Sequence, residues 1–150
     1  MSEPDRAVVE YARVSDEPIV ASDLTALVDD ERAGAIATFT GAVRNHDSGR
    51  RVTALSYSAH PSAEQVLAQV AQEFISRPKV HRLAVAHRVG DLEIGDVALF
   101  VAVAASHREQ AFACVEDLVN RVKDQVPIWK HQTYADGSSS WPGSDDAQRC

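Results

Sequence analysis

The sequence predicts an α+β domain in which helices pack on a mostly antiparallel sheet. Hydrophobic periodicity along the chain predicts strand, helix, strand, strand, helix, strand, strand, helix and strand, joined by short connections. Short links between neighbouring strands favour hairpins over crossovers. At 150 residues, with 45% hydrophobic and 25% charged residues, one domain with a substantial core is expected. We assign it to residues 1–142 and expect residues 143–150 to form a flexible tail.

The first third of the chain is expected to contain two strands around a short helix. Residues 7–14 alternate weakly between apolar and polar side chains, as a strand does. Ser22 is in position to cap a short amphipathic helix, and Gly34 is in position to end it. Residues 35–41 are rich in the β-branched and aromatic residues that strands favour.

A polar loop separates this strand from the next elements. It contains two glycines but lacks the lysine-serine or lysine-threonine pair of a phosphate-binding P-loop. Residues 52–59 resume the strand alternation, and we expect this strand to pair with the one before it. Pro61, tolerated in a first turn, then opens a second helix whose apolar stripe ends before Pro78.

Two strands follow in the middle of the chain. Residues 80–89 carry Leu83, Val85 and His87 on one side, where a histidine is usually a buried core residue. Residues 97–105 are apolar on both faces. Such a strand is either central in its sheet, or covered by a helix on one face and a partner subunit on the other.

The last helix has the clearest start and stop signals. Ser106 followed three residues later by Glu109 predicts a capping box, and apolar residues recur at helical spacing until Pro127 stops the helix. Residues 128–134 then alternate as a strand. An Asp-Gly dipeptide at 136–137 is a hairpin-turn signal, and the serine-rich stretch after it is expected to be mobile.

Charge and composition exclude several classes of protein. The net charge of −7 speaks against a general nucleic-acid-binding surface. No apolar run has the length of a membrane span and no signal-peptide pattern is present, so a cytoplasmic protein without membrane association is expected. The six histidines show no metal-motif spacing, and Cys114 is expected to be a core residue and a poor nucleophile. We therefore expect no metal and no cofactor.

Two lysines flank the corner at Pro127. Lys123 falls at the border of the apolar stripe of the helix, and Lys130 shares a strand face with Ile128 and Gln132. The corner could bring both amines towards one pocket, and the alternative is two solvated surface lysines. A lysine that loses its proton can serve as a base or as a covalent partner of an electrophilic carbon.

Other basic residues point to an anionic ligand. His107 and Arg108 stand at the start of the last helix, where helix N–H groups and the arginine can jointly hold an anion; the alternative is a solvent-facing pair. Arg44, Arg50 and Arg51 form another basic group in the polar loop. A cationic pocket on an acidic protein suits a small anionic ligand.

Four ordered motifs resemble the large, catalytic subunit of molybdopterin synthase. They are residues 39–46 (FTGAVRNH), 85–92 (VAHRVGDL), 106–108 (SHR) and 123–130 (KDQVPIWK). The resemblance covers about residues 5–142, and four motifs at matching spacing are far more specific than any one of them.

The resemblance implies a sulfurtransferase of molybdenum cofactor biosynthesis with an α/β hammerhead fold. Subunits of this family form a homodimer within a heterotetramer, and each end receives a small ubiquitin-like sulfur-carrier subunit whose C-terminal Gly-Gly tail ends in a thiocarboxylate. Two sulfurs pass in turn to cyclic pyranopterin monophosphate, the cyclic phosphate opens, and the dithiolene of molybdopterin forms.

The resemblance also implies roles for individual residues. Lys123 and Lys130 match the catalytic lysines of the family, and Phe39 matches the channel for the carrier's tail. The substrate-binding positions fall on Ala42, Val43, Arg44, His107, Arg108, His131 and Gln132. After Trp141 the chain departs from the family pattern, because it lacks a basic residue that often contributes to the pocket.

Two other functions are compatible with the sequence. One is a non-catalytic module of the same fold that binds a carrier's tail or an anionic metabolite, and the two lysines argue against it. The other is a structural dimer built on an antiparallel sheet. A cationic pocket would separate the structural dimer from the other two functions.

Overall fold

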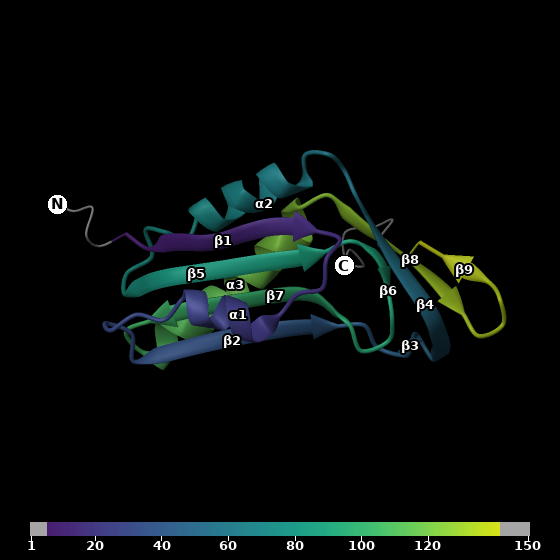
Figure 1. Ribbon diagram of the computed structural model, residues 1–150, viewed down its shortest axis with the longest axis horizontal. Coiled ribbons are helices and arrows are strands. Elements are labelled where there is room, and N and C mark those ends of the chain that lie inside the picture. Colours follow the sequence, from purple (N-terminus) through teal and green to yellow (C-terminus); the bar gives the residue numbers. More distant parts are fainter. Residues whose placement is uncertain (1–5, 142–150) are drawn as a thin grey trace.

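The computed structural model describes residues 6–141, and their strands form two sheets (Figure 1). The first sheet has the order β1-β5-β7-β2. β1 is parallel to β5, whereas β5–β7 and β7–β2 are antiparallel. These strands span Val8–Ser15 (β1), Val80–Arg88 (β5), Val97–Ala105 (β7) and Ala35–Ala42 (β2).

The second sheet is built around β4 (Arg50–Ala59), which pairs antiparallel with β3, β6 and β8. Our prediction that this strand pairs with residues 35–41 is wrong, because β2 pairs with β7 along its whole length. Ser48 and Gly49, both at positive φ, instead fold β3 back onto β4 in a tight hairpin. The remaining strands are His46–Asp47 (β3), Gly90–Leu92 (β6), Ile128–Tyr134 (β8) and Ser139–Ser140 (β9).

Helices cover both faces of the first sheet (Figure 1). α2 (Ala63–Gln72) and α3 (Arg108–Gln125) lie on one face, and α1 (Ala21–Leu27) lies on the other. Alternate residues of β7 enter the two layers: Val101 packs beneath α2 and α3, and Phe100 packs against the α1 side. The apolar strand 97–105 is therefore central, the first of the two expected arrangements.

The predicted helix caps are wrong at the first helix. α1 begins at Ala21 after Val20, so Ser22 lies inside the helix, and its last residue is Leu27. Gly34 does not cap it. The Gly34 N–H donates to the Ser106 carbonyl oxygen at 3.2 Å, and a Cβ at this position would lie 2.6 Å from that oxygen. The glycine instead permits a close approach of two backbone segments.

The later helices also start differently from the prediction. α2 begins at Ala63 after Ser62, so Pro61 precedes the helix. α3 begins after His107 without a side-chain cap, and the predicted capping box is absent. The Ser106 hydroxyl lies 2.8 Å from Nε2 of His81 on β5, so this contact across the fold replaces the local one.

The end of the described chain is ordered as a hairpin. The Asp-Gly turn is confirmed, with Gly137 at φ 87°, and it leads into β9. Our expectation of mobility is wrong for Ser139–Ser140, because β9 pairs with β8 and the Ser140 and Tyr134 hydroxyls are 2.7 Å apart. The tail expected at residues 143–150 lies outside the described residues.

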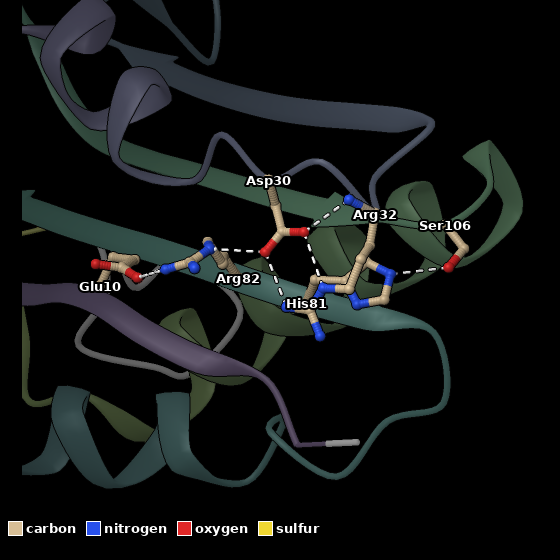
Figure 2. Close-up of polar contacts among 6 residues, drawn as sticks. All are labelled: Glu10, Asp30, Arg32, His81, Arg82 and Ser106. Carbon is tan, nitrogen blue, oxygen red and sulfur yellow. Dashed lines mark hydrogen bonds and ion pairs between the residues drawn. The ribbon is translucent and has the colours of Figure 1, made fainter. Parts of the chain in front are cut away.

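A charged cluster attaches the loop after α1 to β5 (Figure 2). The Asp30 side chain is 5% exposed and accepts bonds from the Arg32 side chain and backbone N–H and from Nε of Arg82, all at 2.8–2.9 Å. Arg82 also pairs with Glu10 on β1. The bonds from Arg32 and Arg82 hold the pKa of Asp30 well below its usual range, despite its burial.

We expect Asp30→Ala to lower the free energy of unfolding at pH 7 by about 1–3 kcal/mol, because the arginines lose a buried acceptor. The folded state depresses the Asp30 pKa, so its contribution is complete above the unfolded pKa of about 3.9 and is lost as the pH falls below it. In urea unfolding, the difference in the free energy of unfolding between wild type and variant should therefore decrease below about pH 4. Exposed Asp29→Ala is the control, and an unchanged midpoint for Asp30→Ala would contradict the prediction.

Candidate active site

The corner after α3 brings the two lysines to one cavity. α3 ends at Gln125, Val126 is extended (φ −80°, ψ 124°), and β8 begins directly after Pro127. The Pro127 carbonyl accepts the His60 N–H at 3.0 Å, which attaches the corner to the end of β4. Lys123 in the last turn of α3 and Lys130 near the start of β8 both line the same cavity and are both half-buried.

This cavity of about 220 Å³ lies where the two sheets meet. The first sheet contributes the end of β2, the end of β5 and the start of β7, and the second contributes β3, β4 and β8. The lining residues are Phe39, Gly41, Ala42, Val43, Arg44, His46, Asp47, Leu55, Tyr57, His87, Ala98, Leu99, Lys123, Lys130 and Gln132. The cavity combines an apolar wall with Arg44 and two lysines, a composition suited to an anionic ligand.

Asp47 organises the polar wall of the cavity. Its Oδ2 accepts a bond from Nε2 of the buried Gln132 at 2.8 Å, and its Oδ1 lies 3.7 Å from an Arg44 guanidinium nitrogen. Asp47 is not among the site residues predicted from the sequence. The signal that could have found it is its position on the same short loop as Arg44, where a carboxylate can orient a guanidinium.

His87 is buried, as expected for a core histidine, but it also lines the cavity. Its Nδ1 lies 2.8 Å from the Arg88 carbonyl oxygen, and its ring meets Tyr57 edge-on with 5.1 Å between centroids. Burial lowers the His87 pKa to about 4; the charge of Lys123 also lowers it, and the bond to the carbonyl opposes the shift. The imidazole is therefore neutral at physiological pH.

Three of the predicted substrate-binding residues lie outside the cavity. His107 and Arg108 are exposed at the start of α3, and Lys123, 15 positions after Arg108, lies about 22 Å further along the helix. His131 is absent from the cavity wall, and its ring packs against Trp141 at 4.7 Å. Phe39, Ala42, Val43, Arg44 and Gln132 do line the cavity with the lysines.

Cys114 is buried, and burial raises the pKa of its thiol to about 11, so it is not an activated nucleophile. Among residues 6–141, no three His, Cys, Asp or Glu side chains are grouped so as to hold a metal ion. No helix in the described part of the chain is long and apolar enough to cross a membrane.

Comparison with known proteins identifies the family. The family model of the MoaE protein matches residues 14–125. The chain belongs to the MoaE family. The molybdopterin synthase catalytic subunit of Halalkalibacterium halodurans is 41% identical over 131 residues, which are 87% of this chain and 83% of that protein. The resemblance inferred from four motifs is thereby confirmed.

Solved structures with MoaE-like chains share the fold. The molybdopterin synthase of Staphylococcus aureus matches with a TM-score of 0.78 and 35% identity, covering 86% of this chain and 94% of that chain. A complex of subunits 1 and 2 of the molybdopterin-converting factor from Helicobacter pylori matches with a TM-score of 0.63 and 20% identity, covering 88% and 90%. The second likeness concerns the fold alone. The predicted α+β class with mostly antiparallel pairing is confirmed.

Proposed function

We propose that this MoaE-family protein is the catalytic subunit of a cytoplasmic molybdopterin synthase. It would transfer sulfur from the thiocarboxylated Gly-Gly tail of a small ubiquitin-like carrier subunit to cyclic pyranopterin monophosphate, in the biosynthesis of the molybdenum cofactor. The observation that carries the proposal is the convergence of Lys123, Lys130 and Arg44 on one cavity. A purely structural dimer has no need of such a cavity.

The polar wall suits the substrate's phosphate. The guanidinium of Arg44 can donate two parallel hydrogen bonds to phosphate oxygens, and Asp47 beside it restricts its orientation. Gln132, held by the same carboxylate, lines the cavity from β8 and would face the heterocycle. Ala42 and Val43 add apolar and backbone surface next to Arg44, which would orient the ring system above the lysines.

The carrier's tail would enter past Phe39. Phe39 and Gly41 line the cavity near the end of β2, and a Cβ at Gly41 would lie 3.2 Å from the Phe39 ring. A side chain at position 41 would meet the Phe39 ring, and a tail without side chains would need the least room beside it. The Halalkalibacterium halodurans relative, 41% identical, is named a catalytic subunit, which supports a second subunit as the partner.

The two lysines would supply the chemistry. Lys123 would act as a base or a transient covalent partner at the carbon that receives sulfur. Lys130 would hold the thiocarboxylate or stabilise developing negative charge. Thiocarboxylate sulfur is already a good nucleophile, so positioning of the two reactants contributes much of the rate.

His107, Arg108 and His131 would bind substrate only in an assembly. About 22 Å of helix separates Arg108 from Lys123, so one chain cannot bring Arg108 and Arg44 to the same phosphate. We propose a homodimer, within a heterotetramer with two carriers, in which the second copy contributes His107 and Arg108 to the cavity of the first. His131, which lies outside the cavity wall, would contact the substrate at the edge of the same site.

A single-turnover assay tests the function. Purified protein, thiocarboxylated carrier and cyclic pyranopterin monophosphate are mixed, and molybdopterin is measured as its fluorescent oxidation product. Product formation supports the synthase. Tight carrier binding without any product would instead favour the non-catalytic binding module.

We expect Arg44→Ala and Arg108→Ala each to weaken precursor binding about 10- to 100-fold, the value of a charge-assisted hydrogen bond. Calorimetric titration of the precursor into each dimer measures this, and exposed Arg51→Ala, outside the cavity, is the control. Mixing the two variants distinguishes a site shared between two chains from a site formed by one chain. A mixed dimer has one intact site if Arg44 and Arg108 come from different chains, so some wild-type affinity should return; no recovery would contradict sharing of the site.

A further inference from the structure

His87 has a ring nitrogen whose hydrogen-bonding capacity is unused within the described part of the chain. The Arg88 carbonyl, 2.8 Å from Nδ1, can only accept a bond, so Nδ1 carries the hydrogen. Nε2 of the neutral ring then has a bare lone pair, and it is buried without a hydrogen-bond partner among residues 6–141. A buried unpaired acceptor costs about 1–3 kcal/mol, so this one calls for a functional explanation.

The surroundings of the ring connect it to the active cavity. His87 lies on the same face of β5 as Leu83 and Val85, which pack in the core beneath α2 and α3. Its ring contacts Tyr57, another residue of the cavity wall. Lys123 lines the same cavity and lies close enough for its charge to act on the imidazole.

The donor that could satisfy Nε2 is restricted by access. Nε2 is closed to solvent, which disfavours direct contact with a bound substrate. A long side chain in the wall of the cavity can reach it by a change of rotamer, and a lysine has a flexible four-carbon stem with three N–H donors at its end. Lys123 is such a side chain, and it comes from the helix that packs on this face of β5.

We propose that His87 is a positioning residue, whose Nε2 accepts a hydrogen bond from the Lys123 amine when the active site is loaded. This inference rests on the proposed function, in which Lys123 acts on the substrate. An imidazole with a pKa of about 4 is far too weak a base to take a proton from an ammonium group. His87 therefore orients Lys123 without becoming charged, and it leaves the proton transfer to the lysine and the substrate.

Two substitutions test the role in turnover. In His87→Leu, which removes the acceptor, the single-turnover rate at saturating precursor should fall about 10- to 100-fold, the cost of a misoriented reacting group. Precursor affinity should stay within about threefold, because the buried Nε2 would bond to Lys123 and not to the substrate. His87→Gln has an oxygen that can accept near the Nε2 position and should recover most of the rate. The matched control is His60→Leu, at an exposed histidine outside the cavity, and it should keep the wild-type rate.

A second measurement decides the proposal even if His87→Leu does not fold or the wild type shows no turnover. Nitrogen NMR of labelled histidine reports whether the bare Nε2 of His87 accepts a hydrogen bond. Adding precursor and carrier to the wild type should shift this resonance, and the shift should vanish in Lys123→Met. A His87→Leu protein with the wild-type rate would overturn the proposal, as would an Nε2 resonance that, with precursor and carrier present, is the same in wild type and Lys123→Met.

Discussion

Lys123→Ala is expected to abolish sulfur transfer while leaving the protein folded. The lysine stands in the last turn of α3, half-buried at the cavity, and is not part of the apolar core. The free energy of unfolding should therefore stay within about 1 kcal/mol of wild type. Removal of a base costs about 10²- to 10⁴-fold in rate, and removal of a covalent partner costs more. Single-turnover kinetics and urea unfolding measure the two quantities.

Two further variants make this prediction specific. Lys123→Arg should stay inactive, because a guanidinium remains protonated and can act neither as a base nor as an amine nucleophile. Arg121→Ala removes a positive charge from the same helix, where Arg121 pairs with Glu73 on the surface, and should keep the wild-type rate. Normal turnover by Lys123→Ala would remove this residue from the mechanism.

Lys130→Ala is expected to lower the single-turnover rate by about 10²- to 10³-fold, the usual loss when a group that stabilises developing negative charge is removed. Lys130 stands on β8 opposite Tyr57 of β4, so the second sheet holds its backbone in place at the cavity. In Lys130→Arg the positive charge remains, and we expect a measurable part of the rate to survive.

The comparison of the two arginine variants assigns the roles of the lysines. Activity in Lys130→Arg but not in Lys123→Arg supports the proposed division, in which only Lys123 must lose a proton. The reverse result would exchange the two roles. Carrier binding, measured separately by titration, should show whether Lys130→Ala also weakens the grip on the thiocarboxylate tail.

Several elements followed from local sequence because their causes are local. The continuous apolar run 97–105, the helical stripe that Pro127 ends, and the alternation of residues 128–134 each correspond to an element of the structure. Backbone geometry and hydrophobic periodicity act over a few residues, so the sequence alone is sufficient to predict them. The corner between Lys123 and Lys130 belongs to this group.

Contacts between distant segments could not be inferred in this way. The Ser106 hydroxyl was available for a helix cap, yet it contacts His81, which is far away in sequence. Gly34 matched a helix stop, yet its role is to approach the Ser106 carbonyl. In both cases the polar group, the Ser106 hydroxyl or the Gly34 N–H, bonds to a residue distant in sequence. The local pattern carries no information about that distant partner.

The sequence by itself determined the family, the helix-to-strand corner and the pair of lysines, because these depend on residue identity and short-range order. Only the tertiary structure decided that β4 belongs to a second sheet, so that the cavity forms between two sheets. It also revealed Asp47 and His87 in the cavity wall, and the distance of His107 and Arg108 from it. Strand pairing joins residues far apart in the chain, so these positions depend on the whole packed molecule.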